Sequence, residues 1–298
     1  RNVNKGAVLA VFLATAAFLL TGCGQLSERA IGDVTVYAFF AVCSFLILPA
    51  YFLLVKRKDP WMLLLMILVC IVNTGYCLVA ASNTLEQALA ANRFSYLGAT
   101  FLPFAMIMII MNVCSLKRKK YIVCLLAGFS TLVFFVAASP GYLDIYYKSV
   151  SLTVINGATV LVKEYGSWHN LYLLYILLYV AIMICMIVRA HCKRKLKSNS
   201  QIFFLAAAFM VNFTVWLIEQ LSVIDYEFLS VSYVISELFL LSLCLVMQEN
   251  ERNNEELKKS YEEKLADSVN AINAAADPSV SESEEYAFFA DNLTALTQ

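Results

Sequence analysis

Three ionisable side chains fall within or at the edges of the long apolar stretches of this chain, where a charge is costly and usually functional. Arg93, Glu219 and Glu237 all belong to the same half of these stretches. Inside a bilayer such side chains normally face the bundle interior and pair, so an ion pair between Arg93 and Glu219 or Glu237 is expected. Glu237 is the strongest functional candidate because it lies deepest. Structural pairing and snorkelling are the alternatives, particularly for Arg93 and Glu219.

Other polar and aromatic residues near the same membrane side complete the candidate ligand-binding set. They are Gln220, Tyr96, Trp168 and His169. The expected chemistry is reversible binding of a small-molecule or lipid-phase ligand. An intramembrane enzyme would need paired catalytic groups, but the apolar segments hold no Asp at membrane depth and His169 has no acid at helical spacing. The chain as it stands is therefore predicted not to be an enzyme.

The nine cysteines do not indicate a metal centre. Most of them lie inside apolar segments, where a cysteine is a small packing residue. Only two histidines are present and no paired ligand spacing occurs. We expect neither a metal nor a cofactor.

The elements that position these residues are long hydrophobic runs. With 61% hydrophobic and 15% charged residues, and runs of roughly 17 to 23 residues that match the hydrocarbon thickness, the chain is an integral membrane protein. The runs lack the alternation of barrel strands, so an all-α polytopic bundle is predicted. The seven expected crossings are Val34–Val55, Trp61–Ser82, Phe94–Ser115, Tyr121–Ala138, Trp168–Arg189, Gln201–Ser222 and Ser230–Met247.

Basic residues cluster in alternate loops and predict the orientation. They occur at 56–58, 117–120 and 189–197, whereas the loops between hold almost none. Because cytoplasmic loops carry this excess, the three loops are assigned to the inside and the chain after Met247 to the cytoplasm. The part up to Met247 carries 18 Lys and Arg against 10 Asp and Glu, and the remainder 4 against 12, so the tail is acidic.

The first 33 residues admit two interpretations. A basic start, a short apolar run and Leu20-Thr21-Gly22-Cys23 fit a bacterial lipoprotein signal, in which Cys23 would be lipidated. The alternative is an uncleaved extra transmembrane helix. Both place residue 23 outside, so the predicted topology of the seven-helix domain, residues 34–247, is the same.

One external loop is long enough to have its own structure. Between Val150 and Val162, β-branched residues flank Asn156-Gly157, a pair that favours the type I′ turn of a β-hairpin. We expect an extracellular hairpin over the outer mouth of the bundle. It either forms a lid over a ligand or only ties two helices together.

The segment 248–277 is predicted to continue the last membrane helix into the cytoplasm. Residues 248–276 contain no Gly or Pro and carry an apolar stripe at Leu257, Tyr261, Leu265, Val269 and Ile272. The narrow stripe favours a parallel coiled-coil homodimer through 248–276, and a solvated linker helix is the alternative. After Pro278, residues 278–298 are expected to be a linker and the start of a truncated effector domain.

Several motifs together resemble a known family. They are Tyr96-Leu97-Gly98 with Pro103, the long loop closing on Tyr165-Gly166-Ser167-Trp168-His169, and the helical extension. Over about Val34 to Met247 the chain is similar to the seven-transmembrane sensor region that precedes bacterial histidine kinases and related regulators. The resemblance implies a multi-pass receptor in the bacterial cytoplasmic membrane, surrounded by lipid and coupled to a cytoplasmic effector.

The chain end adds a second resemblance. Phe288-Phe289-Ala290 and Leu293-Thr294-Ala295-Leu296-Thr297 are similar to the approach into LuxR-type helix-turn-helix domains. This implies a transcription regulator that contacts DNA only through a missing C-terminal domain. A histidine kinase or diguanylate cyclase effector, or a membrane anchor that does not sense, are the alternatives.

Overall fold

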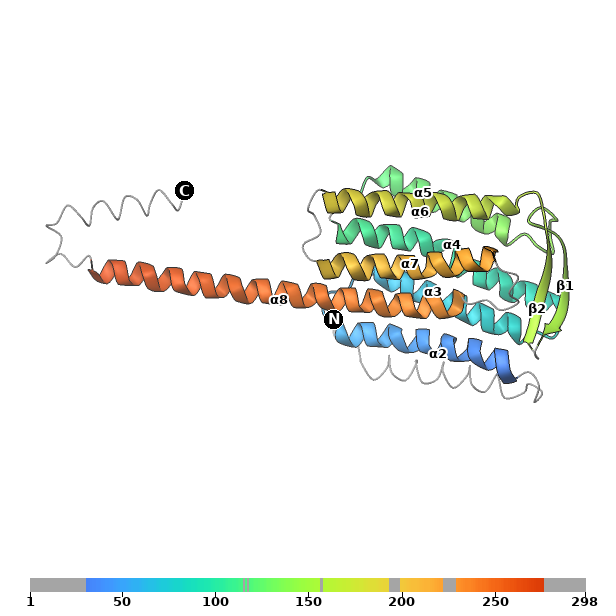
Figure 1. Ribbon diagram of the computed structural model, residues 1–298, viewed down its shortest axis with the longest axis horizontal. Helices are drawn as coiled ribbons and strands as arrows, with labels where there is room; N and C mark the ends of the chain where they lie inside the picture. The colour runs from blue at the N-terminus through green and yellow to red at the C-terminus, as the bar shows by residue number, and fades with distance from the viewer. Residues whose placement is uncertain are drawn as a thin grey trace. The chain divides into compact units, whose positions relative to one another are not determined.

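The chain forms a helix bundle with a β-hairpin across one end (Figure 1). The computed structural model describes residues 31–114, 116, 118–155, 158–192, 199–221 and 229–275. In chain order the elements are α2 (Ile31–Leu54), α3 (Pro60–Ala80), α4 (Leu85–Val113), α5 (Lys120–Ala137), β1 (Tyr147–Ile155), β2 (Ala158–Tyr165), α6 (His169–Cys192), α7 (Asn199–Leu221) and α8 (Leu229–Ala275).

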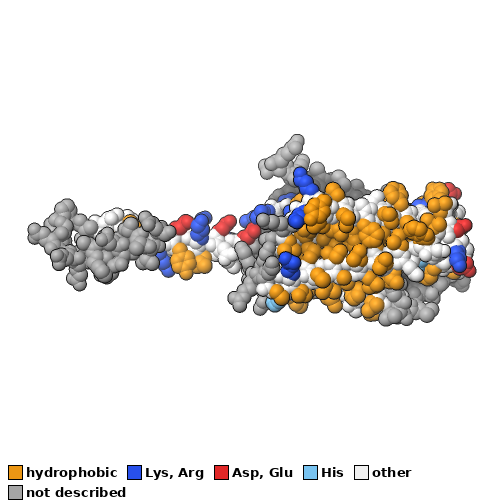
Figure 2. Space-filling view, turned by 90° about the horizontal axis from the view of Figure 1, so that it is seen from above, with side chains coloured by type: hydrophobic (Ala, Val, Ile, Leu, Met, Phe, Trp, Pro, Cys, Tyr) orange, Lys and Arg blue, Asp and Glu red, His pale blue; other side chains and the backbone are white. Residues whose placement is uncertain are grey.

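The length and composition of the helices confirm a polytopic membrane bundle. Six of the described helices are long and apolar enough to cross a membrane, and α7 contributes the shorter apolar stretch Phe203–Glu219. Hydrophobic side chains cover the visible face of the bundle (Figure 2), as a surface in contact with lipid requires. The predicted all-α membrane fold with one hairpin is therefore confirmed.

Helix α4 begins earlier than the sequence predicted, at Leu85 instead of Phe94. The side chain of Thr84 accepts a hydrogen bond from the Gln87 amide, and the Gln87 side chain accepts one from Asn83 N at 3.1 Å. This reciprocal cap starts the helix among polar residues that a hydropathy argument leaves out. Arg93 consequently lies well inside the helix and not at its start.

Two glycines allow α3 and α4 to pack closely. A Cβ atom placed on Gly75 would lie 2.6 Å from Ser95 Cα of α4, and one on Gly98 would meet Leu68 O and Val72 of α3. Small residues at a helix interface let the backbones approach, which increases dispersion contacts in lipid. Among the described helices, α3 and α4 have the most extensive contact with each other.

The predicted hairpin is present, and its strands are longer than expected. Tyr147–Ile155 pairs antiparallel with Ala158–Tyr165, and Ile155 faces Ala158. Asn156 and Gly157 lie outside the described residues. Near the far end of the hairpin, Thr159 Oγ1 donates to Ser82 O at the end of α3 over 2.6 Å. Because the base of the hairpin joins α5 to α6, the two strands cross the end of the bundle (Figure 1).

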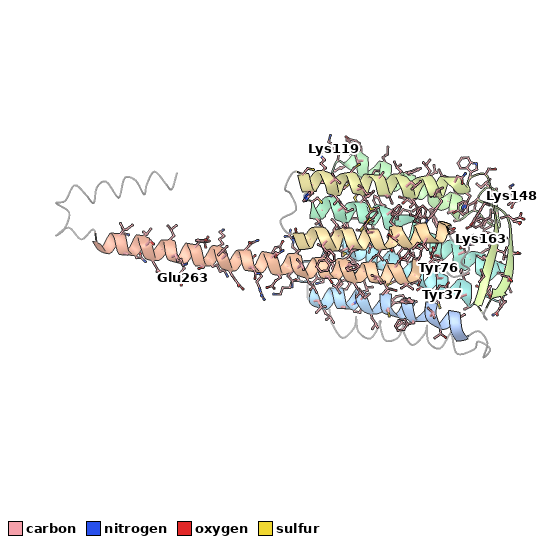
Figure 3. The ribbon with its side chains drawn as sticks, viewed as in Figure 1. Tyr37, Tyr76, Lys119, Lys148, Lys163 and Glu263 are labelled. Carbon is pink, nitrogen blue, oxygen red and sulfur yellow. The ribbon has the colours of Figure 1, made fainter. Side chains whose placement is uncertain are left out.

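A polar cluster fastens the opposite end of the bundle. Asp59 Oδ1 caps α3 by accepting from Trp61 N at 2.9 Å, and its other oxygen accepts from the amide of Asn112 on α4. The hydroxyl of Tyr51 on α2 accepts from Asp59 N at 2.7 Å. Three helices are therefore joined at the loop that carries the first basic run. Lys119, in the second basic run, also lies at this end (Figure 3).

The chain divides into two units at Val246 and Met247, within α8. In the second unit the described side chains from Glu251 onward are exposed. Its apolar stripe has large exposed fractions, 55% at Leu257 and 65% at Tyr261.

Candidate functional site

A cavity of about 350 Å³ lies inside the bundle on the hairpin side. Its walls come from α3, α4, α6, α7 and α8, and the hairpin strands contribute at the mouth. A volume of this size is typical of small-molecule sites. The lining includes Leu65, Val69, Tyr76, Asn92, Ser95, Tyr96, Ala99, Leu102, Pro103, Met106, Tyr146, Tyr147, Lys163, Tyr165, His169, Tyr172, Leu173, Ile176, Val180, Met183, Ala208, Phe209, Asn212, Phe213, Trp216, Glu219, Leu229, Tyr233, Ser236 and Leu240.

Aromatic side chains surround the mouth of the cavity. We call Tyr96, Tyr146, Tyr147, Tyr165, His169 and Tyr172 the tyrosine cluster. The hydroxyl of Tyr96 lies 2.7 Å from that of Tyr147 and 3.3 Å from that of Tyr146. The rings of Tyr165 and His169 stack with their centroids 3.8 Å apart. These contacts connect α4, the hairpin and α6 around one polar surface.

The loop before the hairpin is clamped against the start of α6. Gly166 N donates to Tyr146 O at 2.9 Å and Trp168 N donates to Ile145 O at 3.0 Å. A Cβ atom on Gly166 would collide with the Ile145 carbonyl, so only glycine permits this approach. Burial raises the pKa of the Tyr146 phenol, which therefore stays a neutral hydrogen-bonding group.

Below the cluster the helices present mainly apolar side chains. On α6 the lining positions Tyr172, Ile176, Val180 and Met183 follow helical spacing, so one stripe of the helix faces the cavity. Pro103 lacks the N–H that would donate to the carbonyl of Ala99 on α4. The Tyr175 hydroxyl of α6 donates to the next carbonyl, Thr100 O, over 2.5 Å and so links the two helices beside this interruption.

Hydrogen bonds between side chains join α8 to α7 and α3. The amide of Asn212 donates to Ser236 Oγ at 2.8 Å and accepts from Ser232 Oγ at 2.9 Å. Ser230 Oγ donates to Asn73 Oδ1 at 3.0 Å. Polar pairs of this kind fix the register of membrane helices. The wall that α8 contributes to the cavity is therefore positioned from both sides.

The structure brings Tyr96, His169 and Glu219 of the predicted set together at the cavity. Glu219 also accepts a hydrogen bond from Leu229 N at 2.8 Å, at the first residue of α8. The Nδ1 atom of His169 is buried and has no hydrogen-bond partner among the described residues. These three residues, from α4, α6 and α7, are the part of the candidate set that lines the cavity.

The expected ion pair between Arg93 and Glu219 or Glu237 is wrong. The guanidinium of Arg93 donates to Ala138 O at 3.2 Å and to Pro140 O at 2.6 Å. It also lies 4.2 Å from the centroid of the Tyr142 ring. The last carbonyls of α5 and the following turn need donors, and a long arginine side chain supplies them without burying a second charge. Arg93 thus fastens α4 to the end of α5, outside the cavity lining.

Glu237 is buried as predicted but faces away from the cavity. Its side chain is 0% exposed, and neither carboxylate oxygen has a hydrogen-bond partner among the described residues. The thiols of Cys43 on α2 and Cys70 on α3 are close enough to interact with it electrostatically. A buried carboxyl group without hydrogen-bond partners is energetically costly, so Glu237 is an unsatisfied polar group between α8 and the α2–α3 side.

Of the remaining candidates, only Trp168 has a described side chain, and it does not line the cavity. Trp168 is 51% exposed at the surface and is not part of the lining. The side chain of Gln220, and Cys23 with the whole first segment, lie outside the described residues. The stretch 278–298, on which the LuxR resemblance depends, also lies outside them.

Sequence reasoning missed the members of the tyrosine cluster that come from the loop and from α6. Tyr146 immediately precedes the hairpin, Tyr147 is the first residue of β1, and Tyr172 follows His169 by almost one helical turn. The available signal was the adjacent tyrosine pair at the start of the hairpin. Lys163 of β2 was missed as well, although it lies at the hairpin end of the bundle (Figure 3) and lines the cavity.

Comparison with known proteins agrees with this arrangement. Residues 36–247 match the family model described as the N-terminal 7TM region of histidine kinase. No curated protein and no solved structure gives a significant match. The matched range covers the bundle, the hairpin and the membrane part of α8, which is well over half of the chain. The chain therefore belongs to the family of N-terminal seven-transmembrane regions of histidine kinases.

Proposed function

We propose that this chain is the signal-receiving membrane region of a bacterial histidine kinase. Its bundle responds to a molecule at the hairpin side, and α8 carries the response toward a cytoplasmic catalytic part. The family match supports a kinase more directly than the LuxR-type regulator inferred from residues 288–297. The sequence-based preference for a DNA-binding effector therefore gives way to the kinase alternative.

The observation that carries the proposal is the double role of α8. Leu229, Tyr233, Ser236 and Leu240 form part of the cavity wall, and the same helix is unbroken as far as Ala275. A ligand can shift a conformational equilibrium only through different affinities for its two states. A helix that borders the ligand cavity is the element through which such a difference would be transmitted.

Glu237 is suited to make α8 bistable. The preceding residue, Ser236, bonds to Asn212 of α7 and lines the cavity, whereas the carboxyl group of Glu237 lies on the side of α2 and α3. An unsatisfied buried carboxylate stabilises any alternative arrangement that gives it a partner or water. A small rotation or shift of α8 would do so, and this makes the resting arrangement easy to displace.

We propose that the hairpin is outside the cell and the end of α8 is inside. The basic runs at 56–58 and 118–120 connect α2 to α3 and α4 to α5 at the end of the bundle away from the hairpin (Figure 1). Positive loops are retained on the cytoplasmic side. Reporter fusions after Ala275 should be active only in a cytoplasmic assay, and fusions after Leu143 only in an external assay. The reverse result would contradict the orientation.

A second copy of the chain is the proposed partner of the segment 248–276. The apolar stripe from Leu257 to Ile272 is exposed along a segment whose other side chains are charged, polar or alanine. Pairing two such helices in parallel would cover both stripes. Chemical cross-linking of the full-length protein in native membranes tests for the dimer, and a monomer at all concentrations would refute it.

The decisive experiment measures autophosphorylation of the full-length protein in membrane vesicles. Glu237→Gln keeps the shape of the side chain and replaces the unsatisfied carboxyl group by an amide, so it should change the basal level of phosphate incorporation by roughly tenfold. The matched control is Glu263→Gln, in the exposed part of α8 (Figure 3), which should leave it unchanged.

The experiment tests the kinase assignment and the role of Glu237 independently. Absence of phosphate incorporation in every variant would refute the kinase assignment, and binding of a DNA fragment would then support the regulator instead. Phosphorylation that is equal in the wild type and Glu237→Gln would mean that Glu237 has only a structural role.

A further inference from the structure

We propose that the cavity binds a single-chain amphiphile. Its apolar chain would lie along the walls of the cavity that are farther from the hairpin. A polar head that carries hydrogen-bond acceptors would contact the tyrosine cluster at the mouth. The binding site is inferred from the cavity itself, and only its role as the signal rests on the proposed function.

The lining changes from polar to apolar with depth. The mouth carries the tyrosine cluster and the ammonium group of Lys163, which lies 5.8 Å from the centroid of the Tyr147 ring. The deeper walls consist largely of aliphatic and Met side chains: Leu65, Leu102, Met106, Val180, Met183 and Leu240. A ligand that is apolar at one end and polar at the other matches both parts without burying an unpaired polar group.

The polar groups in the deeper region are already satisfied by one another. Asn212 and Ser236 bond to each other, and Ser236 Oγ also donates to Ala208 O at 2.7 Å. These groups therefore need no hydrogen bond from a ligand. The polar part of a ligand is directed to the mouth, where the hydrogen-bonding capacity lies.

The mouth offers donors beyond those used within the protein. The hydroxyls of Tyr96, Tyr146 and Tyr147 form a hydrogen-bonded trio, with Tyr96 2.7 Å from Tyr147 and 3.3 Å from Tyr146. The Tyr172 hydroxyl has no hydrogen bond to the described residues, and the buried His169 Nδ1 likewise has none. A carboxylate or carbonyl head would accept hydrogen bonds from the phenols.

The cavity is long enough for an extended chain. On α4 the lining runs from Tyr96 at the mouth to Met106, ten residues further, which corresponds to roughly 15 Å along the helix. On α6 it runs from His169 to Met183, roughly 21 Å by the same rise. This depth is more than half of the hydrocarbon thickness of a bilayer. An elongated apolar site of this kind favours a chain over a compact ring system.

The test uses the full-length protein in lipid vesicles with a defined probe. The probe is dodecanoic acid with a photoreactive diazirine at the chain end, and labelled residues are identified by mass spectrometry. Labels are expected near Met106, Met183 and Leu240, where the chain end would lie. An excess of unlabelled dodecanoic acid should compete, and dodecane should compete much less because it has no head.

Two adjacent leucines of α6 provide a matched pair of variants. Leu173 lines the cavity and Leu174 does not, and both are partly exposed, at 37% and 60%. Leu173→Trp fills the cavity and should reduce specific labelling about tenfold. Leu174→Trp adds the same volume to the outer surface and should leave labelling unchanged. Equal labelling in the two variants would overturn the site.

A second pair tests the head. Tyr96→Phe removes the hydroxyl at the centre of the trio and should weaken competition by dodecanoic acid about fivefold, without affecting dodecane. Tyr121→Phe, at an exposed tyrosine of α5 outside the lining, is its control. If dodecanoic acid competes equally well in Tyr96→Phe and in the wild type, the head is not bound by the tyrosine cluster and the proposal is refuted.

The result is separable from the proposed function. Specific labelling without any change in autophosphorylation would retain the site and refute its role in signalling. A responsive kinase that shows no specific labelling would retain the function and refute the amphiphile.

Discussion

The two sides of α4 are packed in opposite ways. Toward α3 the backbones are in close contact at Gly75 and Gly98, with no space for a Cβ atom. Toward α6, α7 and α8 the side chains of Tyr96, Ala99 and Met106 border a cavity of about 350 Å³. One helix therefore separates a rigid contact from an open volume.

The difference shows where the bundle can respond. Close-packed interfaces transmit strain but offer no room for rearrangement, whereas a cavity leaves alternative side-chain positions accessible. The α3–α4 pair is expected to act as a frame. The wall formed by α7 and α8, held by a few side-chain hydrogen bonds, is expected to be the part that moves.

The largest loss of folding stability should come from a substitution in the close contact between α3 and α4. Gly75→Val places a branched side chain against the Ser95 backbone and should destabilise the folded protein by about 2–3 kcal/mol. Thermal unfolding in detergent measures it. Gly128→Val, on α5 with no atom within 4 Å of the added Cβ, is the matched control and should cost much less. Equal losses would mean that the glycines only influence helix propensity.

A smaller loss of folding stability is expected from a substitution in the α7–α8 wall of the cavity. Asn212→Leu removes the bonds to Ser232 and Ser236 that hold α7 against α8, and should cost about 1 kcal/mol. Signalling should nevertheless change more than it does in Gly75→Val variants that still fold. Thr214→Leu, at an exposed position of the same helix, is the control. Unchanged kinase output in Asn212→Leu would contradict a mobile α7–α8 wall.

The smallest loss of folding stability is expected from a substitution in the hairpin. Thr159→Val keeps the shape of the side chain but deletes the hydrogen bond to Ser82 O, and should cost about 0.5 kcal/mol. Access to the cavity should increase, which hydrogen exchange of the Tyr96 region would detect. Thr153→Val on the facing strand is the control, since its hydroxyl has no hydrogen bond to the described residues. Equal exchange in the two variants would show that the hairpin is not a cover.

The sequence allowed the elements to be predicted but only part of the site. Hydropathy located all seven helices, and Asn156-Gly157 located the hairpin. Tyr96, His169 and Glu219 were grouped because each is polar or aromatic near one membrane side, and all three line the cavity. Arg93 was grouped with the glutamates on charge alone, although the free carbonyls at the end of α5 were the nearer partners.

Composition and charge by themselves determined that this chain is a multi-pass membrane bundle. Every backbone group in lipid must be satisfied within its own helix, and this makes each crossing a local property of about twenty residues. Only the tertiary structure decided that loop tyrosines meet α4 and α6 above a cavity. It alone decided that Glu237 faces away from that cavity. Those contacts depend on the rotation of each helix about its axis, which close packing between distant segments fixes and hydropathy does not encode.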